Sequence, residues 1–329
     1  MESWKINHLK NVYLENEDIP EGEVKVRVSK ALLDTTDLNL LKGDGNRYPI
    51  IPSHIAIGNV SEEYEDLGLK FGVKVLISPY EGTDKAADKN VYIAPDIDTM
   101  GVDMDGFLRD YVAVDRDNLF LLPDTVEDKD ALFVEDIALG VKIFSELDID
   151  KGETVVIIGG SALGIILCQL AIYYQAVPIL IDSDSARLSI ATEMGVYYAI
   201  NPQESEVLGQ ILSFTSGRMA DYVIYDPTTN TPLQPALQYS RRGGKIAIAG
   251  HNKANVSIEL SKLLEKQLQL IGINNGYGEI ATAINLVATG SINTKFIQTD
   301  DINFDEVDKK LTSYLELPET DLNIVVSLN

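Results

Sequence analysis

The sequence predicts an α/β protein in two parts, an antiparallel β region followed by a doubly wound parallel sheet. Residues 1–125 read as short alternating segments separated by turn residues, which is typical of antiparallel barrels and sandwiches. Residues from about 135 to 290 instead alternate apolar runs with helix-length patterns, which indicates a parallel sheet with helices on both faces. A glycine turn joins strand to helix at 154–164.

The first region contains segments that alternate apolar and polar residues with the two-residue period of a strand. Strands are predicted at EVKVRVSKALL (23–33), KVLISPY (74–80), KNVYIAP (89–95) and DYVAV (110–114). The end of the chain, DLNIVVSLN (321–329), reads as one more strand, and we expect it to return to this first region.

The second region begins with the apolar run TVVIIGG (154–160), which predicts a buried strand. The next segment, ALGIILCQLAIYY (162–174), has helical length and is apolar nearly all round, so we expect a buried helix. A second strand and helix follow at PILIDSD (178–184) and SARLSIATEMG (185–195), where Gly195 is a natural helix stop. Further strands are predicted at ADYVIYD (220–226), GKIAIAG (244–250) and LQLIGIN (268–274).

Composition excludes several classes of protein. A net charge of −24 argues against a nucleic-acid partner, because little here would neutralise phosphates. The chain has no stretch of about 18 apolar residues, so no membrane span is predicted. Its first residues lack the basic-then-apolar pattern of a secretory signal peptide. The single cysteine, Cys168, excludes an internal disulfide framework and a Cys-rich zinc cluster. We therefore expect a cytoplasmic protein without a membrane partner.

The glycine turn fits the dinucleotide fingerprint G-x-G-x-x-G at Gly159, Ser161 and Gly164. Ser161 departs from the pattern where the backbone approaches the pyrophosphate, although its hydroxyl is able to contact a phosphate. Asp182 ends the next strand, eighteen residues after Gly164, and is placed to accept hydrogen bonds from ribose hydroxyls. Because Asp182 would repel a 2′-phosphate, NAD is favoured over NADP. The alternative is a domain of this fold that binds no cofactor.

Other residues near the predicted strand ends are expected to line the same nucleotide site. These cofactor-binding candidates are Leu163, Ser183, Arg187, Asp226 and Gly250.

An ordered series of segments resembles the medium-chain dehydrogenase/reductase superfamily, particularly its zinc-dependent alcohol and polyol dehydrogenase branch. The resemblance covers essentially the whole chain and implies a GroES-like antiparallel β-barrel domain at 1–133 and 290–329. It also implies a Rossmann domain at 134–289 and a homodimer or homotetramer. The segments include ALLDTTDLNLLKG (31–43), PIIPSHIAIGNV (49–60), DMDGFLRDYVAV (103–114), VEDIALGVKIFSELDIDKGETVVIIGGSALG (134–164) and RRGGKIAIAG (241–250).

The resemblance also implies a catalytic metal site with two departures from the family pattern. Asp34 stands where the family has its first ligand, a cysteine, while His54 and Glu135 match the second and third ligands. The acid that often follows the histidine is Ile55 here. The four cysteines of the family's structural zinc are absent, so we expect one catalytic zinc and no structural zinc.

Two interpretations of this site stay open. In the first, Asp34, His54 and Glu135 bind the metal with ordinary oxygen and nitrogen chemistry. Asp37 then matches the family residue that accepts the second N–H of the ligand histidine, and Thr36 matches the residue that passes the alcohol proton outward. In the second interpretation the site is degenerate, with Asp34 in a turn, His54 in the core and Glu135 as a helix-start acid.

The resemblance implies an NAD-dependent oxidoreductase that acts on a small molecule. Hydride would pass between NAD(H) and a secondary alcohol, polyol or sugar, or the matching ketone, with assistance from the metal. One alternative is a metal-free NAD(P)H-dependent quinone or enoyl reductase, and the pairing of His54 with Asp37 argues against it. The other alternative is a non-catalytic nucleotide-binding protein, which Ser161 and Ile55 keep open.

Overall fold

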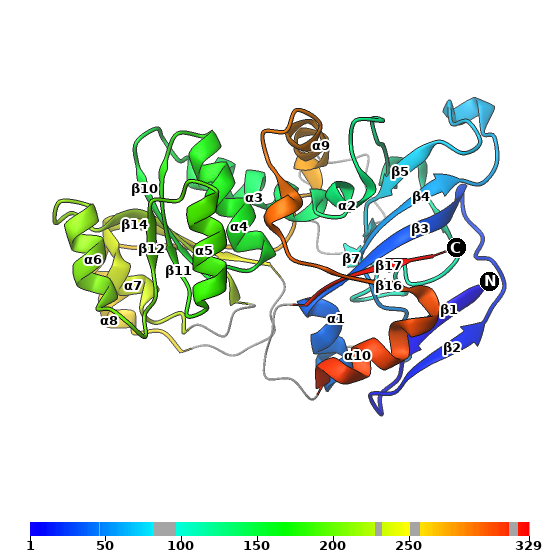
Figure 1. Cartoon of the computed structure of the whole chain (residues 1–329), viewed down its shortest axis with the longest axis horizontal. Helices are drawn as coiled ribbons and strands as arrows, with labels where there is room; N and C mark the ends of the chain where they lie inside the picture. The colour runs from blue at the N-terminus through cyan, green and yellow to red at the C-terminus, as the bar shows by residue number, and fades with distance from the viewer. Residues whose placement is uncertain (46, 82–96, 228–231, 251–256, 316–321, 329) are drawn as a thin grey trace. The chain divides into compact units, whose positions relative to one another are not determined.

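The computed structural model describes residues 1–45, 47–81, 97–227, 232–250, 257–315 and 322–328. The chain forms two compact units, which are labelled by element in Figure 1. Unit 1 comprises Met1–Glu135 with Gln298–Asn329, and unit 2 comprises Asp136–Ile297. The strand predicted at KNVYIAP lies outside the described residues.

Unit 2 is built on a six-stranded sheet in which every pairing is parallel. The strand order β12-β11-β10-β13-β14-β15 becomes 3-2-1-4-5-6 when counted along the chain, which is the order of dinucleotide-binding sheets. This confirms the doubly wound part of the predicted fold. The strands are β10 (Thr154–Ile158), β11 (Val177–Ile181), β12 (Tyr198–Ile200), β13 (Ala220–Tyr225), β14 (Ser240–Ala249) and β15 (Gln269–Ile273).

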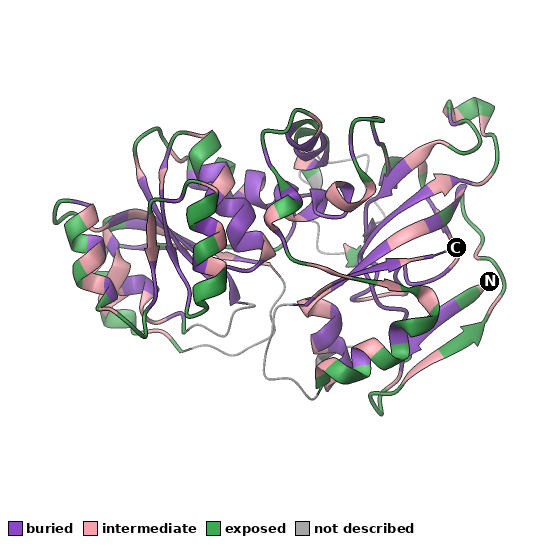
Figure 2. Ribbon diagram, in the orientation of Figure 1, coloured by how far each residue is buried: buried purple, intermediate pink, exposed green. Residues whose placement is uncertain are grey.

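Helices flank or connect these strands, and most of them contribute buried apolar residues to unit 2. Every residue of β10 is buried, and so is most of helix α4, as the purple ribbon of Figure 2 shows. Helix α5 ends just before Gly195, whose φ of 99° suits the left-handed region. The helices are α3 (Val134–Leu147), α4 (Ala162–Tyr173), α5 (Ser185–Glu193), α6 (Val207–Phe214), α7 (Ala236–Tyr239), α8 (Leu260–Lys266) and α9 (Ile280–Ala288).

Unit 1 contains a seven-stranded, mostly antiparallel sheet in the order β16-β17-β3-β4-β5-β9, with β8 also paired to β3. The last strand, β17, pairs antiparallel with β3, so the end of the chain returns to this unit as predicted. Only β16 and β17 pair in parallel among the described strands of this sheet. The strands are β3 (Val24–Asp34), β4 (Ile55–Val60), β5 (Lys74–Ile77), β8 (Tyr111–Val114), β9 (Leu119–Leu121), β16 (Asp300–Asn303) and β17 (Asn323–Ser327).

Shorter elements complete unit 1. Two strand pairs lie outside the main sheet: β1 (Glu2–Ile6) with β2 (Val12–Asn16), and β6 (Tyr80–Glu81) with β7 (Asp98–Thr99). The helices are α1 (Thr35–Asn39), α2 (Asp128–Ala131) and α10 (Val307–Leu315). In neither unit is a described helix both long and apolar enough to span a bilayer.

Candidate functional site

Helix α1 begins where strand β3 ends, at Asp34. The backbone of Asp34 is extended, with φ −123° and ψ −169°, and its Oδ1 accepts the N–H of Thr36 at 2.8 Å and of Asp37 at 3.4 Å. Asp37 in turn accepts the backbone N–H of Asp34 at 3.0 Å through Oδ2. These reciprocal bonds form a capping box, so the order D-T-T-D itself brings two carboxylates together at this turn.

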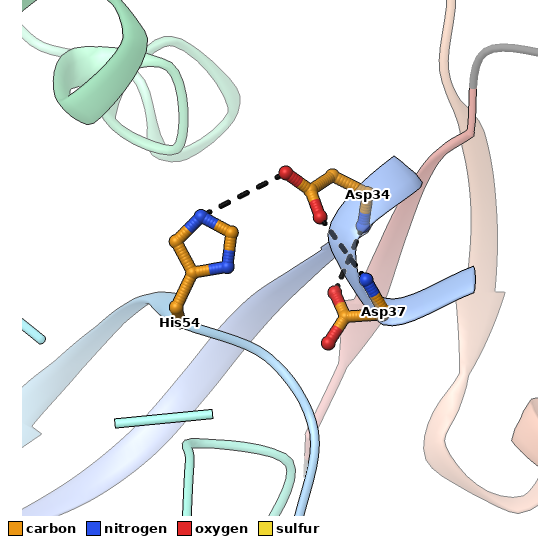
Figure 3. Close-up of side chains that lie close together, drawn as sticks. All are labelled: Asp34, Asp37 and His54. Atoms are coloured by element: carbon orange, nitrogen blue, oxygen red, sulfur yellow. Dashed lines mark hydrogen bonds and ion pairs between the residues drawn. The ribbon is translucent and has the colours of Figure 1, made fainter. Parts of the chain in front are cut away.

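His54 lies opposite this turn because of the register of the two strands. Strands β3 and β4 pair antiparallel with Leu32 opposite Ile55, which brings the residue just before β4 beside the end of β3. The second oxygen of Asp34, Oδ2, lies 3.7 Å from Nε2 of His54, as Figure 3 shows. The His54 side chain is buried, whereas 23% of the Asp34 side chain is exposed, so solvent reaches the cluster from the Asp34 side.

Asp37 holds the backbone on both sides of this contact. Its carboxylate is fully buried and accepts the N–H of Ser53 at 2.6 Å as well as that of Asp34 at 3.0 Å. Ser53 precedes His54 directly and has a φ of 72°. Asp37 therefore fixes the chain at Asp34 and His54 together, and its expected bond with the imidazole stays a prediction.

The cluster carries more negative than positive charge. Burial, followed by the charge of Asp34, raises the pKa of Asp37 to about 7. Burial alone would lower the pKa of His54, but the carboxylates of Asp34, Glu135 and Asp37 raise it overall. Three carboxylates, those of Asp34, Asp37 and Glu135, thus act on the single imidazole of His54. A bound cation would balance the charge of such a buried group.

Glu135 lies near the cluster but is held by another residue. It is buried at the second position of α3, and its Oε1 accepts a hydrogen bond from the hydroxyl of Tyr80. Among the described residues, the ligand atoms of Asp34, Asp37 and His54 lie within 4.8 Å of one another, and Glu135 is not part of that group. Sequence reasoning missed Tyr80, because nothing in the segment SPY signals a partner 55 residues away.

The donor set fits a divalent metal ion. Carboxylate oxygens and an imidazole nitrogen are ordinary ligands of zinc, and three of them already converge at Asp34, Asp37 and His54. The hydroxyl of Thr36 lies 3.4 Å from Asp34 Oδ2, beside the same carboxylate. A metal here would contact side chains that the capping box and the strand register hold in place.

In unit 2, the glycine turn after β10 has the geometry that its sequence predicts. Gly159 has a φ of 111°, and a Cβ at Gly164 would lie 2.0 Å from the carbonyl oxygen of Gly159. Both positions therefore require glycine. Ser161 has a φ of −60° and caps α4, with its Oγ accepting the N–H of Gly164 at 3.2 Å. The Ser161 hydroxyl donates to the buried carboxylate of Asp226, which follows β13.

Asp182 lies at the carboxyl end of β11, beside the same turn. Its Oδ2 accepts the N–H of Gly160 at 2.6 Å and its Oδ1 that of Asp184 at 2.7 Å. Arg187 Nη1 lies 3.4 Å from Oδ2. The carboxylate is only 5% exposed, so the backbone of the glycine turn and the start of α5 hold it in one orientation.

The remaining cofactor candidates also follow strands or begin helices of unit 2. Leu163 is buried in the first turn of α4, Ser183 is exposed after β11, and Gly250 follows β14 with a φ of 78°. In open parallel sheets, ligands bind at the carboxyl ends of the strands. The structure brings these candidates to that end of the sheet.

Two protein-family models match the chain, one in each unit. A model described as alcohol dehydrogenase GroES-like domain matches residues 20–124, and one described as zinc-binding dehydrogenase matches residues 162–289. An uncharacterized zinc-type alcohol dehydrogenase-like protein of Haemophilus influenzae is 26% identical over 95% of each chain. A sorbitol dehydrogenase of Bacillus subtilis is 25% identical over 95% of this chain and 92% of its own.

A solved structure from Escherichia coli has a similar fold. It is described as a short chain alcohol dehydrogenase complexed with NADH, and it superposes with a TM-score of 0.88 at 20% identity. The match covers 100% of this chain and 99% of the other.

Proposed function

We propose that the chain transfers hydride between NAD(H) and a secondary alcohol, polyol or sugar, or the matching ketone. The premise is its family, because the chain belongs to the zinc-dependent alcohol and polyol dehydrogenase-like branch of the medium-chain dehydrogenase/reductase superfamily. It is therefore an oxidoreductase. The observation that carries this proposal is that Asp34 and His54 lie together beside the buried Asp37, while the charge of Glu135 also acts on His54. The names of the relatives support the same class of small hydroxylated substrates.

In this proposal Asp34, His54 and Glu135 hold one divalent cation. When bound, such an ion polarises the substrate oxygen as a Lewis acid and makes a substrate hydroxyl more acidic. Asp37 keeps Asp34 and His54 in place through their backbone, because it accepts the N–H groups of Asp34 and Ser53.

The proton of the substrate hydroxyl needs a path to solvent. Thr36 is the proposed relay, because its hydroxyl lies 3.4 Å from Asp34 Oδ2 and its side chain is partly exposed. Asn39, one turn further along, is unable to take a proton, so water is the acceptor after Thr36.

The nucleotide is bound by unit 2. Gly159 and Gly164 allow the tight turn, and the start of α4 would favour an anionic group of the cofactor, as helix N-termini do in general. Asp182 supports a preference for NAD(H), since a carboxylate held in one orientation accepts hydrogen bonds from ribose hydroxyls and repels a 2′-phosphate. The nicotinamide carries the redox chemistry, and the chain aligns it.

The test is turnover of a substrate panel by protein treated with a chelator and then reloaded with metal. We expect NAD⁺-dependent oxidation of a secondary alcohol or polyol that the chelator abolishes and that zinc or manganese restores. Reduction of quinones or enoyl compounds at a rate the chelator does not change would instead support the metal-free reductase. NAD(H) binding without turnover of any panel member would support a non-catalytic protein.

A further inference from the structure

Tyr80 makes a buried contact that the proposed function does not use. Its side chain is only 2% exposed, and its hydroxyl donates to Oε1 of Glu135. Because one oxygen of Glu135 accepts this bond, the other oxygen, Oε2, is the one that Glu135 can turn toward a cation. A carboxylate restrained in this way would coordinate a cation through one oxygen, whereas a carboxylate that rotates freely can coordinate it through one oxygen or through both.

The backbone around Tyr80 is itself firmly held. Asn118, which is fully buried, donates through Nδ2 to the carbonyl of Tyr80 at 3.1 Å and to that of Ser78 at 3.0 Å. The N–H of Met100 donates to the carbonyl of Pro79 at 2.8 Å. These bonds clamp the segment on both sides of the ring, so the hydroxyl is a fixed anchor.

Glu135 is close enough to affect the cluster without joining it. Its charge contributes to the raised pKa of His54. The group of ligand atoms within 4.8 Å of one another is nevertheless Asp34, Asp37 and His54, as far as the described residues show. The contact with Tyr80 explains this position, because it holds Glu135 by one oxygen at the border of the cluster.

We propose that Tyr80 is a positioning residue that restrains Glu135 to single-oxygen coordination of the metal. The phenol keeps Oε1 and orients Oε2 toward the ion, in the way that hydrogen-bonded partners orient metal ligands in general. This inference rests on the proposed function, in which Asp34, His54 and Glu135 hold a divalent cation.

The experiment measures Co²⁺ binding by the full-length wild-type chain and the Tyr80→Phe variant, by competition with a chromophoric chelator and by visible absorption. Phenylalanine keeps the ring and removes only the hydroxyl. We expect affinity to fall roughly ten- to a hundredfold, the usual scale when a hydrogen bond to a metal ligand is lost. The loss arises because an unrestrained Glu135 must be ordered when the metal binds. The d–d bands should also weaken, because a released Glu135 is able to bind through both oxygens, which raises the coordination number.

A matched control and a double variant identify the path of the effect. Tyr314→Phe removes another phenol–carboxylate bond in unit 1, from Tyr314 to Asp300 at 2.7 Å, and should leave Co²⁺ binding unchanged. In a Glu135→Gln background, Tyr80→Phe should add no further loss, because its effect passes through the Glu135 carboxylate.

Failure of the inference is distinct from failure of the proposed function. If the wild-type chain binds no Co²⁺, the metal-dependent function itself is wrong. If the wild type binds Co²⁺ and Tyr80→Phe has the same affinity and spectrum, the positioning role of Tyr80 is overturned while the function stands. An equal loss on Tyr80→Phe in the Glu135→Gln background would also overturn it.

Discussion

Helices α1 and α4 begin in the same way but use their capping residue differently. Asp34 caps α1 at the position where the dehydrogenase family has a cysteine, and Ser161 caps α4 at the position where the family pattern has a glycine. At α4 the capping hydroxyl is buried and also bonds the carboxylate of Asp226. At α1 one oxygen of Asp34 makes the cap and the other faces His54, and the Asp34 side chain is partly exposed.

The difference shows that a departure from a family pattern has a purely structural role at one helix start and an additional binding role at the other. The polar atom of Ser161 is directed into unit 2, so the backbone of the turn remains as the surface for an anion. The carboxylate of Asp34 both stabilises the start of α1 and is a proposed metal ligand. Substitutions at the two helix starts should therefore have different consequences.

The largest effect is expected at Asp34. Asp34→Ala should lower metal affinity and turnover by about a hundredfold or more, since it removes a ligand, and should destabilise the metal-free protein by about 1 kcal/mol through loss of the cap. Asp34→Asn is the matched control, because asparagine caps helices as well as aspartate. It should lose the metal while keeping the stability measured by urea unfolding. Equal destabilisation by both variants would contradict the divided role of the carboxylate.

Nucleotide selectivity is the next effect. We expect NAD(H) to bind about tenfold or more tightly than NADP(H), because the held carboxylate of Asp182 opposes a 2′-phosphate. Calorimetric titration of both nucleotides measures this, and Asp182→Ser should erase the preference. Asp184→Asn keeps the cap of α5 and should leave the preference intact. A wild-type chain with equal affinities would remove the assigned role of Asp182.

The two carboxylates of the capping box also predict a pH dependence for the metal-free protein. The pKa of Asp37 is raised from 3.8 to about 7, so between these values the folded state keeps a proton that the unfolded state has released. Stability should therefore fall as pH rises from about 4 to about 7, by at most about 1.4 kcal/mol per pH unit. The raised pKa of His54 acts in the same direction, because the stability that protonated His54 contributes is lost as pH rises through the pKa of His54 in the folded state.

Urea unfolding of the chelator-treated protein at pH 5 and pH 8 measures this dependence. Asp37→Asn should flatten it, because asparagine does not titrate. A metal-free wild-type chain that is more stable at pH 8 than at pH 5 would show that the folded state does not hold this extra proton on Asp37.

The smallest effect is expected at Ser161. Ser161→Ala should destabilise the protein by about 1 kcal/mol through the lost cap, with some further loss from the Asp226 contact. The dissociation constant for NADH should change less than about threefold, because the hydroxyl faces Asp226 while a backbone surface receives the pyrophosphate. Urea unfolding and fluorescence titration give the two values. A large loss of NADH affinity at unchanged stability would mean that the serine contacts the cofactor.

Local features of both helix starts could be predicted from the sequence. The glycine turn at Gly159 and Gly164 follows from the strand, the spacing and the apolar helix, all of which are visible within residues 154–174. The fold class followed from the change between two-residue and helical periodicity, and the comparisons confirm it. These features depend on neighbours along the chain.

Long-range contacts could not be predicted in the same way. The bond from Ser161 to Asp226 joins residues 65 apart, and that from Tyr80 to Glu135 joins residues 55 apart. Each depends on which strands become neighbours and in what register, which no local pattern specifies. Ile55 illustrates the same limit: it is 1% exposed and lies opposite Leu32 in the sheet, so its position calls for an apolar side chain.

Elemental analysis of the full-length chain, purified without chelator or histidine tag, tests the central claim most directly. We expect about one divalent metal per chain, with zinc or manganese as the candidates, since Asp34, His54 and Glu135 supply oxygen and nitrogen ligands. A chain that contains no metal, turns over its substrate at full rate and does not respond to added zinc would contradict the claim. His54 would then be a core histidine without a catalytic role.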